Sequence, residues 1–186
     1  MKPGITSKED IMQVCRKIAA EQGLPAVNMR AVAKECGIAL GTLYNYYASK
    51  DELLMATVES VWKDIFHMDG TRAAGMSFPD YAAYLFDRAR TGAEAYPGFL
   101  GAHSIAVAKS RRGQAKSIME HTFEHMKAGM LAVLRADTAA DTAVFSPAFQ
   151  ESDLVDFVLD QILLLLVKGA DNSNALVELI RRVIYQ

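Results

Sequence analysis

NMRAVAKECGIALGTLYNYYASKDELL, residues 28–54, is the segment with the most specific structural pattern in this chain. Within it, Ala33 and Gly37 lie four residues apart. Two short helices that cross at a steep angle need a small residue where their backbones approach, and Ala33 meets that need. The tight turn between the helices needs a residue that adopts positive φ without strain, and Gly37 meets that need. The spacing predicts a helix-turn-helix whose second helix spans about residues 40–47.

The exposed side of that second helix carries groups suited to binding phosphates. Thr42, Tyr44 and Tyr46 offer hydroxyl groups, and Lys50 offers a positive charge at the start of the next helix. Helix-turn-helix units place their second helix in the major groove of DNA, and such groups contact the phosphates. The pattern therefore indicates a DNA-binding unit.

Groups that suit base reading are fewer. Arg30 suits bidentate contact with guanine, and Asn45 or Asn28 suits adenine or a phosphate. Leu40 and Ala39 suit the methyl group of thymine. Plain solvent exposure is the alternative for single residues such as Asn45, and packing without DNA is the alternative for the whole segment.

Length and composition indicate a folded chain with a substantial core. The sequence has 186 residues, of which 51% are hydrophobic, and a net charge of −2. Residues 1–56 carry seven Lys and Arg against six Asp and Glu, a balance of +1. This asymmetry is too small to identify a nucleic-acid binder, although a two-fold dimer can present a positive face.

The sequence predicts a cytoplasmic protein without a membrane segment. Met1–Asp10 lacks the apolar region of a signal peptide. The most apolar stretch, Leu154–Val167, is too short to span a bilayer and is interrupted by two aspartates. Two cysteines, Cys15 and Cys36, do not indicate a disulfide framework.

Helical periodicity dominates, so the predicted fold class is all-α with about nine helices. The helices are expected over residues 8–22, 28–37, 40–47, 50–68, 77–96, 98–110, 114–136, 152–168 and 172–185. A break is expected at residues 111–113 and a loop at residues 137–149. Capping pairs such as Ser7 with Asp10 and Ser49 with Glu52 support the helix starts.

Residues 8–55 resemble the N-terminal domain of the tetracycline-repressor (TetR) family. The matching residues are Ala33, Gly37, Gly41, Thr42, Leu43, Tyr44, Tyr46, Tyr47, Ser49, Lys50, Leu53 and Leu54. The resemblance implies a three-helix DNA-binding domain over residues 1–49. It also implies a connecting helix with a helical bundle for effector binding and dimerisation over residues 50–186.

The resemblance also assigns individual residues. Arg30, Thr42, Tyr44, Tyr46 and Lys50 match family DNA contacts, and Tyr47 matches an aromatic residue that packs inward. Two positions depart from the family pattern: Ala39 stands where Ser is common, and Asn28 where Thr is frequent. The full predicted DNA-binding set is Asn28, Met29, Arg30, Ala39, Leu40, Gly41, Thr42, Tyr44, Asn45, Tyr46 and Lys50.

Within residues 50–186, aromatic and methionine residues suit either a core or an apolar effector pocket. The candidate pocket residues are Trp62, Phe66, Tyr84, Tyr96, Phe99, His103, Met119, Phe123, Met126 and Met130. The helix at residues 152–168 is apolar nearly all round, which favours burial against a second copy. The candidate dimer residues are Leu159, Ile162, Leu163, Leu166, Leu176, Leu179, Ile180 and Val183. A core within one chain is the alternative.

No catalytic or cofactor-binding pattern stands out. His121 and His125 lie four residues apart, but no third metal ligand is indicated. Neither Cys15 nor Cys36 has an evident cationic activator that would favour a redox sensor. We therefore expect no enzyme, no cofactor and no metal.

These observations predict a homodimeric repressor that binds an inverted-repeat operator in double-stranded DNA. The resemblance implies that a small, partly apolar effector releases it. The alternative is a helical carrier or enzyme of apolar small molecules, with a helix-turn-helix that does not bind DNA.

Overall fold

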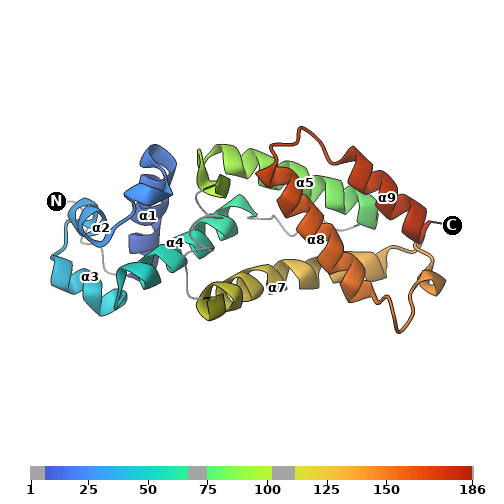
Figure 1. Ribbon diagram of the computed structural model, residues 1–186, viewed down its shortest axis with the longest axis horizontal. Helices are drawn as coiled ribbons and strands as arrows, with labels where there is room; N and C mark the ends of the chain where they lie inside the picture. The colour runs from blue at the N-terminus through green and yellow to red at the C-terminus, as the bar shows by residue number, and fades with distance from the viewer. Residues whose placement is uncertain (1–6, 67–74, 102–111, 186) are drawn as a thin grey trace. The chain divides into compact units, whose positions relative to one another are not determined.

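The computed structural model describes residues 7–66, 75–101 and 112–185, and for residues 112–122 it describes the backbone alone. Within these ranges every regular element is a helix, and the β-structure amounts to one isolated bridge between Ser146 and Phe149 (Figure 1). The predicted all-α class is therefore confirmed.

The chain divides into two compact units. The first comprises Met1–Ile65 with Gly92–Glu120, and the second comprises Phe66–Thr91 with His121–Gln186. The sequence predicts a division by function, into a DNA-binding domain that ends at residue 49 and an effector-binding domain that begins at residue 50. The two compact units do not test that boundary, which stays a prediction.

Four α-helices and a short 3-10 helix make up the N-terminal part of the first unit. They are α1 (Lys8–Gln22), η1 (Leu24–Ala26), α2 (Met29–Cys36), α3 (Leu40–Tyr46) and α4 (Lys50–Ile65). A capping box starts α1: the Ser7 hydroxyl accepts the Asp10 amide at 3.1 Å, and the Asp10 carboxylate accepts the Ser7 amide at 3.1 Å. The apolar sides of these helices share a core that includes Ile11, Cys15, Ile18, Val32, Leu43, Leu53 and Val61.

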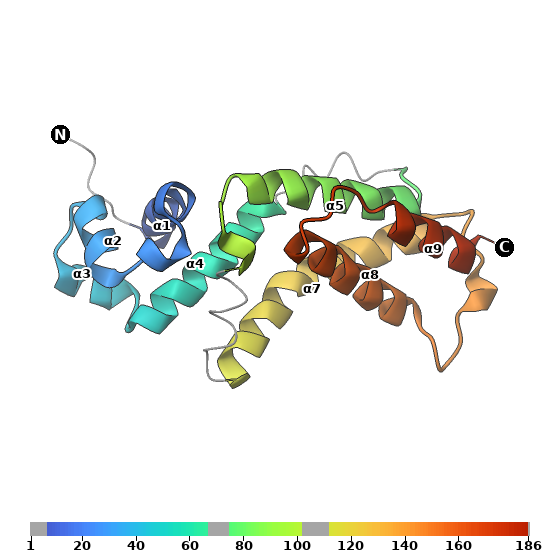
Figure 2. The same cartoon turned by 45° about the horizontal axis from the view of Figure 1, so that its top comes forward.

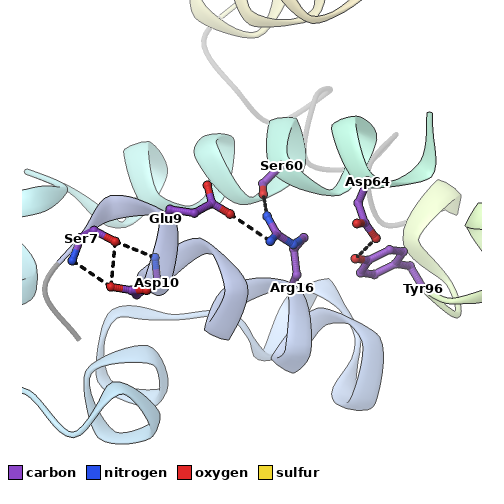
Figure 3. A network of polar contacts seen from close by, with 7 residues as sticks. All are labelled: Ser7, Glu9, Asp10, Arg16, Ser60, Asp64 and Tyr96. Carbon is purple, nitrogen blue, oxygen red and sulfur yellow. Dashed lines mark hydrogen bonds and ion pairs between the residues drawn. The ribbon is translucent and has the colours of Figure 1, made fainter. Parts of the chain in front are cut away.

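A polar network joins α1, α4 and the segment after α5 within the first unit (Figure 3). The Arg16 guanidinium of α1 donates to the Ser60 hydroxyl of α4, and it pairs with Glu9 at 3.1 Å. One turn further along α4, the Asp64 carboxylate accepts the Tyr96 hydroxyl at 2.6 Å. Burial, followed by the bond to Asp64, raises the pKa of Tyr96 above its usual range.

The second unit contains most of α5 (Phe78–Glu94), the C-terminal half of α7 (Arg112–Ala136), and three later elements. These are η2 (Thr142–Val144), α8 (Glu151–Val167) and α9 (Asn174–Ile184) (Figures 1 and 2). Its core is aromatic and aliphatic, with Phe78, Tyr81, Leu85, Phe86, Met130, Leu154, Val158, Ile162, Ile180 and Ile184 each at most 2% exposed.

Asp137 ties three helices of the second unit together. Lying just after α7, its carboxylate accepts the Phe78 amide at the start of α5 at 2.7 Å and the Tyr185 hydroxyl just after α9 at 2.5 Å. It also accepts the Ala139 amide at 3.1 Å. A half-buried carboxylate with such partners defines where the ends of α5, α7 and α9 meet.

The boundaries of the described helices agree closely with the sequence expectations, with one correction; most of the expected helix over residues 98–110 lies outside the described residues. Residues 111–113 were expected to break the chain, yet α7 already begins at Arg112 and includes Gly113. The expected loop at residues 137–149 is confirmed apart from η2 and the isolated bridge.

None of the described helices combines the length and the apolar character that crossing a membrane requires.

Candidate nucleic-acid interface

The turn between α2 and α3 has the geometry that its sequence predicts. Gly37 adopts the left-handed conformation, with φ 69° and ψ 29°, directly after α2. The Ile38 amide then donates to the Ala33 carbonyl at 3.0 Å, which closes the end of α2. A side chain at Gly37 would meet no atom within 4 Å, so the positive φ, rather than space, requires glycine.

The helices α1 to α4 (Lys8–Ile65) form the part called here the head, and two large residues anchor the inner side of α3 in its core. Leu43 is fully buried, and Tyr47, directly after α3, is 4% exposed. The Lys8 ammonium lies 5.4 Å from the centre of the Tyr47 ring. Burial raises the pKa of Tyr47 to about 12, so the phenol is neutral at physiological pH. Tyr47 therefore packs inward, as the family resemblance implies.

Most of the predicted DNA-binding residues lie together on the solvent side of this helix-turn-helix. Tyr44 is 47% exposed and Leu40 is 37% exposed. The other exposed members are Arg30, Ala39, Gly41, Thr42, Asn45 and Lys50. Ala39 is the residue before α3 and makes no side-chain capping bond, as expected for Ala in place of Ser.

Three members of the predicted set are placed differently. Met29 is 6% exposed and belongs to the core, so its assignment as a DNA contact is wrong. Asn28 is half-buried and caps α2. Its side-chain carbonyl accepts the Ala31 backbone amide at 3.0 Å, and its side-chain NH₂ group donates to the Ala26 backbone carbonyl at 3.0 Å. Tyr46 is half-buried.

The exposed basic groups of α1, α2 and α4 differ in their pairing. Lys17 pairs with Glu35 at 2.7 Å, and the Glu35 interaction raises the pKa of Lys17. Among the described residues, Arg30, Lys34 and Lys50 form no ion pair. These three cations are therefore available for phosphate oxygens or base edges.

The candidate effector residues fall into both units. In the first unit, the Phe99 ring lies 5.3 Å from Trp62, edge to face, and 6.2 Å from Tyr96. In the second unit, Phe66 and Phe123 are 6.2 Å apart. Met130 is fully buried there, whereas Tyr84 and Met126 are partly exposed. His103 lies outside the described residues, and so does the side chain of Met119.

Burial within the chain leaves few of the candidate dimer residues available for a partner. Five of them are at most 7% exposed in the second unit's own core: Leu159, Ile162, Leu166, Leu176 and Ile180. Leu163 and Val183 are half-buried, and Leu179 is 44% exposed. Sequence reasoning missed Phe157, Leu164 and Val167, which are 42%, 42% and 54% exposed on α8. Their spacing of seven and three residues is the signal that places them on one side of the helix.

Both thiols are buried, and burial is the main cause of their raised pKa values, which reach about 11 for Cys15. A thiol of high pKa is a poor nucleophile and a poor redox sensor at neutral pH. The described residues contain no group of three metal ligands, and the side chain of His121 lies outside them.

Comparison with known proteins adds family information about this head. Residues 11–57 match the family model described as bacterial regulatory proteins, tetR family. The HTH-type transcriptional regulator UidR of Escherichia coli (strain K12) is 38% identical over 48 residues, which is 26% of this chain and 24% of UidR. The chain spans between 23% and 31% of the length of the curated relatives that it matches.

Solved structures resemble the chain over most of its length. BioQ of Mycobacterium smegmatis has a TM-score of 0.60 at 21% identity, covering 88% of this chain and 80% of BioQ. The multidrug binding protein EbrR, complexed with imidazole, has a TM-score of 0.60 at 18% identity, covering 95% of this chain and 93% of EbrR. At such identities the likeness establishes the fold alone.

Proposed function

We propose a function that rests on one premise, that this chain belongs to the TetR family of bacterial regulatory proteins. The chain is a helix-turn-helix transcriptional regulator by family, and we infer that it acts in the cytoplasm as a homodimeric repressor. Two copies bind an inverted-repeat operator in double-stranded DNA, and a small, partly apolar effector releases them. The observation that carries this proposal is the side of α3 that faces solvent, which is polar and aromatic. The opposite side of α3 is fixed in the core by buried residues.

The DNA contacts are divided between phosphates and bases. The hydroxyls of Thr42 and Tyr44 and the ammonium of Lys50 are exposed and suit phosphate oxygens. Tyr46 adds a hydroxyl from a half-buried ring. Arg30, at the start of α2, suits a guanine edge. In a two-fold dimer, the two copies of α3 read half-sites ~34–36 Å apart, one turn of DNA.

Dimerisation is supported by the exposed apolar residues of α8 and α9. Phe157, Leu164 and Val167 follow one side of α8, and Leu179 is exposed on α9. Exposed large apolar residues in a row favour association, and a second copy of the same helices gives a two-fold interface. This surface replaces most of the interface that the sequence predicts.

An effector acts only if it binds one arrangement of the two α3 helices better than the other. The aromatic residues Trp62, Tyr96 and Phe99 support an apolar ligand with some polar groups. EbrR, a fold neighbour, is a multidrug binding protein complexed with imidazole, which favours a small-molecule effector here too. The family match supports a regulator rather than the alternative carrier or enzyme.

The test is binding of the full chain to duplex DNA from upstream of its own coding region, across a salt series. We expect a site-specific complex whose affinity falls steeply with salt. Lys50→Ala should weaken binding and lower the salt slope by about one counterion, because one phosphate contact is lost. Tyr44→Ala should weaken binding with little change in slope.

Lys63→Ala is the matched control, since Lys63 is also an exposed lysine of α4 but pairs with Glu59 at 2.7 Å. It should leave the affinity and the slope unchanged. If Lys50→Ala and Tyr44→Ala both bind like the parent chain, the contact assignment is wrong. If the parent chain shows no site-specific binding to any duplex, the proposed function fails.

A further inference from the structure

The outward side of α3 is uncharged along its whole length. The residues exposed there are Leu40, Gly41, Thr42, Tyr44 and Asn45, and α3 contains no Lys, Arg, Asp or Glu. Leu40 and Tyr44 lie one turn apart, which is ~5.4 Å along a helix. The nearest unpaired basic groups in sequence, Lys34 and Lys50, belong to α2 and α4, and Arg30 lies one turn before Lys34 on α2. The helix expected in the major groove therefore offers apolar surface and neutral polar groups to the bases.

Gly41 has no role that the chain itself explains. It lies in the first turn of α3 without a positive φ, and a Cβ built on it meets no atom within 4 Å. Alanine is a better helix former than glycine, so neither conformation nor packing within the chain favours glycine. A missing side chain at an open, exposed position fits a surface that another molecule approaches closely, at backbone distance.

The major-groove edges of the four bases limit what such a surface can recognise. Guanine is read best by the paired donors of Arg or Lys, whereas thymine presents a methyl group and adenine suits the amide of Asn. Leu40 matches the methyl group, Asn45 matches adenine, and Gly41 lets the helix lie close to both. Paired donors for guanine are absent from α3.

Building on the proposed function, we propose that α3 selects T·A base pairs in the operator half-site, through a thymine methyl group packed on Leu40. Gly41 sets the close approach that this contact needs, and Asn45 reads a neighbouring adenine. Guanine recognition is then confined to the base pairs within reach of Arg30 and Lys34 on α2. The specificity of this regulator is thus divided between two helices of different chemistry.

The first test selects duplexes from a random DNA library with the full chain. The expected product is an inverted repeat whose half-sites contain T·A pairs at the positions read by α3. Each thymine is then replaced by deoxyuridine, which removes the methyl group alone. We expect affinity to fall about fourfold at a contacted thymine, the factor that corresponds to ~0.8 kcal/mol for one buried group of methyl size.

Leu40→Ala assigns that loss to one side chain. The variant should bind the parent duplex about fourfold more weakly and should no longer distinguish thymine from deoxyuridine at the contacted position. Leu40→Met, which keeps apolar volume, should retain most of the discrimination. An unchanged thymine preference in Leu40→Ala overturns the assignment, and so does a selected half-site with G·C pairs at its centre.

Gly41→Ala tests the close approach, with Gly129→Ala in α7 as the matched control. A Cβ at Gly129 makes an ordinary 3.7 Å contact with the Tyr81 hydroxyl, and a Cβ at Gly41 meets no atom within 4 Å. Neither substitution causes a clash, so both variants should leave the melting temperature unchanged or raised. We expect Gly41→Ala to weaken DNA binding at least fivefold and Gly129→Ala to leave it unchanged. If Gly41→Ala binds DNA with the same affinity as the parent chain, the proposed close approach at Gly41 is overturned. Failure to select any duplex would instead overturn the proposed function.

Discussion

Gly37 and Gly41 show how the same residue type serves two purposes four positions apart. Both have open space where a side chain would stand, but Gly37 alone has a positive φ, of 69°. The sequence spacing with Ala33 predicts the turn at Gly37, because that conformation is rare for other residues. Nothing in the spacing distinguishes Gly41, whose lack of neighbours is visible in the tertiary structure alone.

At the residue scale, we predict that Gly37→Ala destabilises the fold by about 1 kcal/mol, because alanine must adopt the left-handed conformation at the end of α2. Denaturant unfolding measures this difference. Gly41→Ala is the control with equal open space and ordinary φ, and it should not lower the free energy of unfolding. Equal effects of the two variants would contradict the conformational explanation.

At the scale of elements, the predicted helices agree with those described because each has local start and stop signals. Ser7 with Asp10, Asn28 and Gly37 are capping residues whose bonds are seen in the structure. Contacts between helices carry no such local signal. The bond from Arg16 to Ser60 and the bonds of Asp137 with Phe78 and Tyr185 join residues more than 40 positions apart, so sequence periodicity cannot reveal them.

We predict that Asp137→Asn destabilises the second unit in a pH-dependent way. Burial opposes ionisation of Asp137, but the hydrogen bonds from Tyr185, Phe78 and Ala139 outweigh it and lower its pKa. A lowered pKa in the folded state adds stability above the unfolded value of about 3.9, and this stability is lost as pH falls through the folded pKa.

The Asp137→Asn variant should therefore lose about 1–2 kcal/mol near pH 7 and progressively less below about pH 4. Thermal unfolding over a pH series measures the difference. Tyr185→Phe keeps the carboxylate but removes one donor, so its loss should be smaller. A loss for Asp137→Asn that is as large at pH 3 as at pH 7 would refute the role of the carboxylate charge.

At the scale of the whole molecule, the proposed association depends on which side of α8 stays exposed. Its composition is apolar all round, and composition cannot say which side a single chain covers. The second unit buries Leu159, Ile162 and Leu166, and it leaves Phe157, Leu164 and Val167 exposed. The sequence therefore pointed to α8 for the proposed dimer surface, but it chose mainly residues that the core of the second unit buries.

We predict that Leu164→Glu weakens self-association at least tenfold, because it places a charge on the proposed apolar interface. Sedimentation equilibrium measures the dissociation constant. Ala132→Glu adds the same charge to an exposed position of α7 and should leave association unchanged. A dimer of parental stability in Leu164→Glu would place the interface elsewhere.

Local chemistry was sufficient for the helices, for the helix-turn-helix and for the family model that residues 11–57 match. Turn conformation, capping and periodicity act over a few residues, so they can be read along the chain. Burial is a property of the packed chain: the structure places Met29 in the core and leaves Phe157, Leu164 and Val167 exposed on one side of α8. Which exposed groups remain for DNA and for a second copy is therefore settled by packing, because each helix has several sides and only its neighbours determine which are covered.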